Sequence, residues 1–137
     1  MDLHRIIAAS ALIALGGCAS VPVPYSEAKP TPNNKQILFA EATPSTVPVT
    51  LIRDRQFVGS ICATKIMVDE KVAAYVGVAE RVTLNIPVGE VILGAEPAGI
   101  CNGGLAEHEV NLTPGKPLYF RISISQNAET HIYRTIP

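Results

Sequence analysis

The feature that most constrains this fold is an alternation of apolar and polar residues along the C-terminal two thirds of the chain. Val82, Leu84 and Ile86 alternate with three polar residues, and residues 118–125 repeat the pattern. Successive side chains of a β-strand point to opposite faces, so this period of two predicts strands with one buried face. No stretch keeps the 3.6-residue period of a helix, and residues 73–80, the one place for a helical turn, favour a strand.

Turn-forming residues separate the alternating stretches. The chain contains 11 prolines and ten glycines, and turn sequences recur about every ten residues. The expected turns are 68–72, 87–90, 113–117 and 126–129, with a glycine-rich loop over 96–104. Seven or eight short strands at this spacing predict an all-β fold, an antiparallel β-sandwich over residues 46–137. A short closed barrel is the alternative, and periodicity does not separate the two.

Single residues in this pattern predict where strands end and which side chains face water. Pro48 lacks an amide hydrogen, so it predicts that the first strand lies at a sheet edge. The polar tripeptide Arg53-Asp54-Arg55 ends this strand, and a second stretch runs from 57 to 67. The residues expected on water-facing sheet surfaces are Arg81, Thr83, Glu107, Glu109, Arg121 and Ser123.

The N-terminus has the pattern of an export signal. Arg5 precedes a run of ten largely apolar residues, 6–15, which is too short for a transmembrane helix of about 20 residues. The sequence Leu15-Gly16-Gly17-Cys18 follows, and it resembles the lipobox of bacterial lipoproteins. The resemblance implies that residues 1–17 are a signal peptide and that Cys18 becomes a lipidated N-terminus. The alternative is an ordinary secretory signal with a chance cysteine.

Cleavage after residue 17 leaves 137 − 17 = 120 residues. Acyl chains contribute about 0.8 kcal/mol per buried CH₂, so the two or three chains on Cys18 would anchor the protein to a membrane, facing the periplasm. Residues 18–45 are assigned to a proline-rich tether, because 19–35 show no periodic pattern and are expected to be disordered. Over 36–45, where Ile37, Leu38 and Phe39 occur, a docked short strand or turn is the alternative. Under the enteric sorting rule, Ala19 in place of aspartate favours the outer membrane over the inner.

The other two cysteines are expected to pair with each other. An exported chain meets an oxidising compartment, and an even pair of cysteines there predicts a disulfide between Cys62 and Cys101. Such a bridge closes a loop of about 40 residues and is worth on the order of 4 kcal/mol in the chain-entropy model. The alternative is a catalytic or metal-binding thiol, which is disfavoured because neither cysteine has a CxxC partner or a histidine at ligand spacing.

The segment Ile86-Pro87-Val88-Gly89-Glu90, followed by Val91-Ile92-Leu93, resembles part of PEGA-type domains. Several segments together also resemble a group of small bacterial lipoproteins that share a related β-domain and a paired-cysteine GxCxGG loop. The resembling segments are Ile52-Arg53-Asp54, Phe57-Val58-Gly59-Ser60-Ile61-Cys62, Ile66-Met67-Val68-Asp69-Glu70-Lys71-Val72-Ala73, Ile86-Pro87-Val88-Gly89-Glu90 and Gly99-Ile100-Cys101-Asn102-Gly103-Gly104-Leu105-Ala106-Glu107. The resemblance covers about residues 47–135. It implies a β-sandwich and a cell-envelope location, but no known activity. Glu70 stands where the hairpin usually carries Gly or Asn, so a turn longer than two residues is expected there.

The residues give no support for an enzyme, a cofactor or a metal site. His4 leaves with the signal peptide, His131 is expected at the surface, and His108 has glutamates on both sides. In a strand those two glutamates point away from the His108 face, so the three do not form a metal site. The sequence contains no nucleophile elbow, Walker loop or HExxH motif.

Two functions remain open at this point. The net charge of −1 gives no attraction to nucleic acid. We expect a non-enzymatic envelope lipoprotein with a structural or accessory role, which binds another envelope protein through its sheet edges and an interaction loop of Asn102, Gly103 and Gly104. The alternative is a module that binds envelope glycan or another ligand. Its aromatic platform would have to come from Tyr75, Tyr119 and Tyr133.

Overall fold

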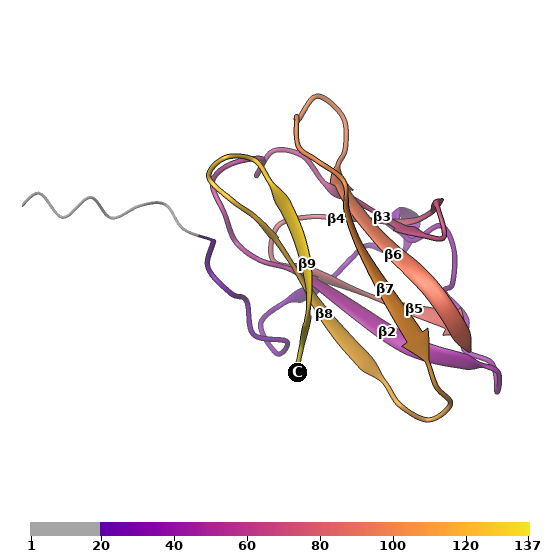
Figure 1. Ribbon diagram of the computed structural model, residues 1–137. Coiled ribbons are helices and arrows are strands. Elements are labelled where there is room, and N and C mark those ends of the chain that lie inside the picture. The colour runs from indigo at the N-terminus through magenta and orange to yellow at the C-terminus, as the bar shows by residue number, and fades with distance from the viewer. Residues whose placement is uncertain (1–19) are drawn as a thin grey trace, which may run out of the picture.

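The computed structural model describes residues 20–137, so the predicted signal peptide and Cys18 lie outside the described residues. Two β-sheets pack face to face, and the prediction of an all-β sandwich is confirmed (Figure 1). Eight strands of five or more residues and one short strand make up this part of the chain. Over the same residues, no helix is long and apolar enough to cross a bilayer.

The first sheet has five strands, in the order β1-β5-β2-β8-β9. Their bounds are β1 Lys29–Pro30, β2 Thr46–Arg53, β5 Glu80–Pro87, β8 Leu118–Ile124 and β9 Thr130–Thr135. Strand β2 runs antiparallel to β5 and parallel to β8, and β1 is parallel to β5. The sheet is therefore mixed.

The second sheet has four strands, in the order β4-β3-β6-β7, and all its pairs are antiparallel. Their bounds are β3 Thr64–Val68, β4 Lys71–Val76, β6 Gly89–Pro97 and β7 Ala106–Leu112. A single 3₁₀ turn, η1 Asn33–Lys35, is the one helical element in residues 20–137.

The core lies between the sheets and is built from the apolar rows that the alternation predicted. Val82, Leu84 and Ile86 are all at most 3% exposed, and the even-numbered residues of β8 from Leu118 to Ile124 are buried beside them. The ring of His108 lies edge-on against Phe120, with ring centroids 5.1 Å apart. Burying such side chains is the main favourable term in folding.

Pro48 does not mark an edge strand, and that prediction was wrong. Strand β2 is the third of five strands. Its pairing with β8 begins only at Val49, opposite Leu118, so Pro48 lies one residue before that ladder. The missing amide hydrogen therefore leaves no β8 carbonyl without a partner.

The hairpin between β3 and β4 has a two-residue turn, so the expected longer turn was also wrong. Asp69 and Glu70 have φ values of 47° and 67°, and Val68 pairs directly with Lys71. Two left-handed residues in succession are the signature of a type I′ turn, in which Gly or Asn is preferred. The Asp69 carboxylate accepts a hydrogen bond from the Ile92 amide at 2.9 Å, which helps to hold the turn.

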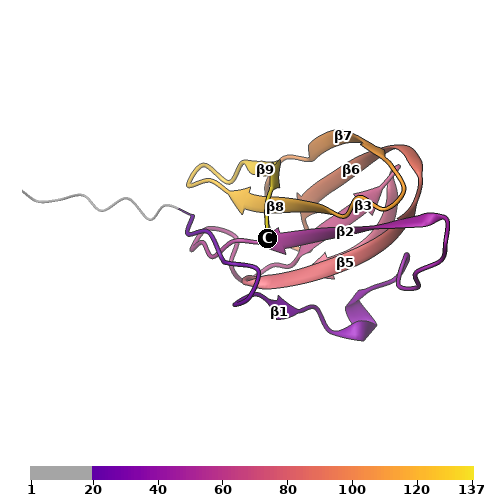
Figure 2. The same cartoon turned by 90° about the horizontal axis from the view of Figure 1, so that it is seen from below.

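The N-terminal segment differs most from its prediction. Residues 20–45 do not form a free tether: Val23 is fully buried and Ala28 is 2% exposed. Val21 exchanges two backbone hydrogen bonds with Arg55, of 2.7 and 3.0 Å. Figure 2 shows this segment running across the first sheet and along the outer edge of β5, where it forms β1. The folded unit therefore begins near residue 20 rather than at 46.

Candidate functional site

One end of the sandwich gathers most of the residues that the sequence singled out. Strands β2, β6 and β8 finish there, and the loops 54–63, 98–105 and 125–129 form its surface. We call this the disulfide end, and it lies at the upper left of Figure 1. Ser20 lines a small hollow there together with residues of the 125–129 hairpin. The described chain therefore starts at this end.

A disulfide joins two of these loops. Cys62 and Cys101 are bonded, with their Cα atoms 6.1 Å apart, and the predicted pairing is confirmed. Residues 57–62 form turns rather than the start of a strand, because β3 begins only at Thr64. At Gly103, an added Cβ would come within 2.5 Å of the Pro97 ring and 3.0 Å of the Ala128 carbonyl oxygen. Only glycine fits this close approach of loop 98–105 to the 125–129 hairpin.

The buried Arg53 holds the turn that carries Cys62. Its side chain is fully buried, and its guanidinium donates to the carbonyl oxygens of Gly59, Cys62 and Val76. Burial lowers the pKa of this guanidinium from 12.5 to about 10, partly offset by the charge of Glu80. The group is still protonated at neutral pH, so its donors remain available to all three carbonyls.

Asp54, the next residue, holds the N-terminal segment. Its carboxylate is 1% exposed, and it accepts from the Val23 amide at 3.1 Å and from the Arg121 guanidinium. Arg121 in turn donates to the Val23 carbonyl oxygen at 2.9 Å. The Tyr133 hydroxyl lies 3.4 Å from the other carboxylate oxygen. Both backbone groups of Val23 are therefore bound by this buried ion pair.

Arg121 is buried, and the expectation that it faces water was wrong. It is 9% exposed because the N-terminal segment covers this part of the first sheet. The segment is also held by aromatic contacts: the Tyr25 ring lies edge-on to Tyr119, with centroids 5.7 Å apart. The Arg81 guanidinium stacks 4.6 Å above Tyr25 and donates to the Ala28 carbonyl. The outer face of this sheet thus binds the chain's own N-terminal segment.

The three tyrosines considered as a glycan platform do not share one surface. Tyr119 lies beneath Tyr25, and Tyr133 is on β9 with its hydroxyl directed at Asp54. Tyr75 is on β4, in the other sheet. Burial next to Asp54 raises the pKa of the Tyr133 hydroxyl, with burial as the larger cause.

The two histidines are also far from forming a site. His108 packs inward on Phe120, and His131 is exposed, with its Nε2 atom 4.0 Å from Glu129. Over residues 20–137, no three His, Cys, Asp or Glu side chains are grouped so that they could hold a metal ion.

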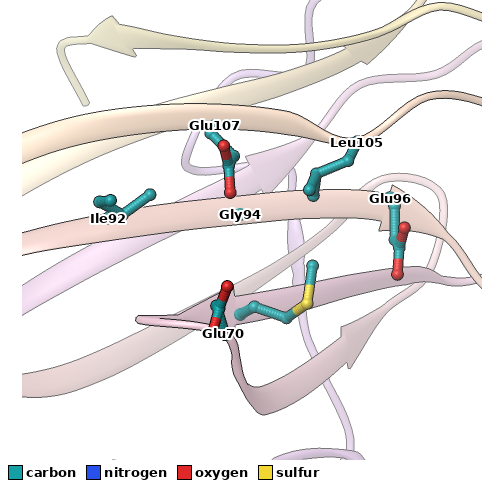
Figure 3. Close-up of a pocket in the computed structure, with 7 residues that line it drawn as sticks. Glu70, Ile92, Gly94, Glu96, Leu105 and Glu107 are labelled. Atoms are coloured by element: carbon teal, nitrogen blue, oxygen red, sulfur yellow. The ribbon is translucent and has the colours of Figure 1, made fainter.

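A shallow hollow of about 230 Å³ lies on the outer face of the second sheet (Figure 3). Its lining residues are Met67, Glu70, Ile92, Gly94, Glu96, Leu105 and Glu107. Glu96 is already paired with Lys65. An apolar floor with carboxylates at its rim has the chemistry to take a small cationic group with an apolar body. The alternation assigned this face to solvent, so the sequence did not reveal the hollow.

The comparisons with known proteins add little to this geometry. No family model matches the chain, and no curated protein matches it. A solved structure with some likeness is described as the NMR structure of the protein from Eubacterium rectale. It has a TM-score of 0.45 and 12% identity, and the match covers 72% of this chain and 96% of that one. A likeness at that level carries no argument about function.

Proposed function

We propose that this chain is a lipid-anchored protein of the bacterial cell envelope, with a non-enzymatic role in binding another envelope protein. The observation that carries the proposal is the sequence Leu15-Gly16-Gly17-Cys18 at the end of a ten-residue apolar run. It places the thiol for lipidation just before residue 20, where the folded unit starts. Ala19 favours the outer membrane as the site of anchoring.

The disulfide supports the proposed export. Disulfides persist in oxidising compartments such as the bacterial periplasm and are rare in the cytosol. Cys62 and Cys101 are bonded to each other. Of the three cysteines, Cys18 is then the one whose thiol is available for lipidation, as a lipoprotein requires.

The sheet edges support a protein-binding role. Strands β7 and β9 are the last strands of their sheets, so each has one side without a hydrogen-bonded neighbour in its own sheet, and the two strands contact each other across the sandwich. Unpaired strand edges can add an extended segment of a partner through backbone hydrogen bonds. Asn102, Gly103 and Gly104 are all exposed, and they form a further candidate contact in loop 98–105.

The alternative is a ligand-binding module, and the hollow in Figure 3 is the observation that favours it. Its apolar residues Met67, Ile92 and Leu105 suit a small amphipathic molecule better than a glycan, because glycan sites stack sugars on exposed aromatic rings. The chain's tyrosines do not form such a surface.

Labelling of the full precursor in a bacterium tests the anchor. The wild-type chain should incorporate labelled palmitate, sediment with membranes and have a mature N-terminus at Cys18. The Cys18→Ser variant should lose the label and leave the membrane fraction. The double variant Cys62→Ser/Cys101→Ser is the matched control, because it removes the other two cysteines and should keep the label. Label retained by Cys18→Ser, or a mature chain that begins elsewhere, would refute the proposal.

Site-specific cross-linking in intact cells tests the protein-binding role. A photo-crosslinking residue at the exposed Glu109 of β7 should give one adduct of defined mass. The same residue at exposed Glu41, away from that edge, should not. The same adducts at both positions, or none, would refute the protein-binding role and favour the ligand-binding alternative.

A further inference from the structure

The disulfide end carries an unusual group of exposed apolar side chains. Four large apolar residues of the described chain are more than 80% exposed: Phe57 at 81%, Ile61 at 83%, Ile100 at 87% and Ile136 at 81%. Ile136 is the penultimate residue of the chain. The other three all lie on the two loops that the disulfide joins. Scattered exposed apolar residues are normal, but three at one end form a patch that needs an explanation.

These three side chains are held by a fixed frame. Ile61 and Ile100 each immediately precede a cysteine of the disulfide. Phe57 and Ile61 lie in one turn, which the buried Arg53 binds through the carbonyl oxygens of Gly59 and Cys62. These three side chains, which we call the apolar tips, therefore extend from loops that a disulfide and hydrogen bonds hold in place.

The parts of the two loops that carry the tips contain no charged residue. Residues 56–63 and 98–105 include no Asp, Glu, Lys or Arg. The turns at the opposite end of the sandwich differ, since residues 69–71 are Asp, Glu and Lys and the turn at 113–117 contains Lys116. Moving charged groups out of water is costly, whereas moving apolar side chains out of water is favourable. The two tip-bearing segments are thus suited to an apolar environment, and the exposed charges of the disulfide end, Arg55 and Glu129, lie outside them.

The start of the described chain lies at the same end. Val21 pairs with Arg55, only two residues before Phe57. Cys18 is three residues before Val21, and three residues span at most about 11 Å. If Cys18 is acylated, which is the proposed function on which this inference rests, its lipid lies within that reach of the disulfide end.

We propose that Phe57, Ile61 and Ile100 form a membrane-contacting tip, which inserts into the bilayer that holds the acyl chains of Cys18. The disulfide end then faces the lipid, and the exposed pair Arg55 and Glu27 beside it lies among the headgroups. Strands β7 and β9, which contact each other across the two sheets, extend from the disulfide end away from the membrane.

Tryptophan fluorescence tests the tip, because the chain contains no tryptophan of its own. The full acylated protein is placed in vesicles of phosphatidylethanolamine and phosphatidylglycerol, with Phe57→Trp, Ile100→Trp or Ile136→Trp as the single probe. All three positions are highly exposed, so the substitutions should leave the fold intact. The first two probes should shift to the blue and lose most of their emission to brominated lipids. The matched control at 136 should show neither effect.

Vesicle flotation separates failure of the tip from failure of the anchor. A chain that does not float has no lipid anchor, and that result overturns both proposals. A chain that floats while the probes at 57 and 100 resemble the control keeps its anchor, and only the tip is overturned. Probes that shift without lipid, in step with protein concentration, would assign the patch to a second copy of the chain, which also overturns the tip.

Discussion

Arg53 and Asp54 are neighbours in sequence that stabilise two different parts of the fold. Strand geometry sends successive side chains to opposite faces. Arg53 therefore binds the turn of Cys62, while Asp54 binds Val23 of the N-terminal segment. Both side chains are almost fully buried, and each is satisfied by several hydrogen bonds.

The first residue-scale prediction concerns Arg53. Arg53→Met should lower the free energy of unfolding by about 2–4 kcal/mol, because it removes the buried donor that serves the carbonyl oxygens of Gly59, Cys62 and Val76. The change is measured by chemical denaturation. Arg55→Met is the matched control two residues away, where the side chain is 52% exposed, and it should change stability by less than about 0.5 kcal/mol. Equal effects of the two changes would contradict the role given to Arg53.

The second prediction concerns the buried ion pair. Asp54→Ala should cost about 3–5 kcal/mol, because it leaves the Arg121 charge buried without its partner. The exposed Glu27 lies 4.0 Å from Arg55, and Glu27→Ala should have almost no effect. Urea unfolding of the two variants side by side gives the comparison. If Asp54→Ala lowers the free energy of unfolding no more than Glu27→Ala does, Arg121 reaches water in the native state.

The sequence pattern does not show which of the charged residues Arg53, Asp54, Arg55 and Arg121 are buried and which are exposed. Arg53-Asp54-Arg55 is simply a polar tripeptide at a strand end, and Arg121 sits on a polar face. Asp54 and Arg121 bind Val23, which is 31 and 98 residues away from them, and Arg53 binds the turn of Cys62 and Val76. The local pattern does not encode any of these contacts. The cysteine pair was predictable, because an even number of thiols in an exported chain has a simple chemical use.

At the scale of elements, alternation predicted the strands well. It identified the buried rows of β5 and β8 and the turns between most strands. It failed at Pro48 because edge position depends on where the β8 ladder starts, which a single strand does not reveal. It missed the packing of residues 20–31 because that segment has no alternating apolar row. Its buried apolar residues Val23 and Ala28 pack with Ile52, and polar and aromatic contacts to the first sheet hold the rest.

The β3–β4 turn gives a prediction at this scale. Glu70→Gly should raise the free energy of unfolding by about 0.5–1 kcal/mol, since relief of the left-handed strain exceeds the added entropy of glycine. Thermal unfolding measures the gain. Glu109→Gly, the same exchange in the middle of β7, should be destabilising instead. A loss of stability at residue 70 would conflict with the positive φ found there.

The disulfide gives a second prediction for elements. Cys62→Ser/Cys101→Ser should reduce the free energy of unfolding by about 4 kcal/mol, because the bridge spans 39 residues and restricts the unfolded chain. Denaturation of the wild-type protein with and without a reductant provides the same comparison without mutation. If neither treatment changes stability, the bridge does not hold the two loops in solution.

At the scale of the whole molecule, the N-terminal segment determines how the sandwich stands relative to its anchor. A disordered tether of 18–45 would hold the domain away from the membrane, as the composition suggested. The structure instead docks residues 20–31 on the first sheet and brings the start of the described chain to the disulfide end. The proposed membrane contact depends on that docking, because the docking brings the start of the described chain close to the exposed tips.

Hydrogen exchange at the Val23 amide, in the full-length protein, tests this docking most directly. The amide is fully buried and donates to Asp54, so it should exchange as slowly as amides in the central strands β2 and β8. Exchange at the rate of an unstructured peptide would show that the segment is a free tether, and it would contradict the account.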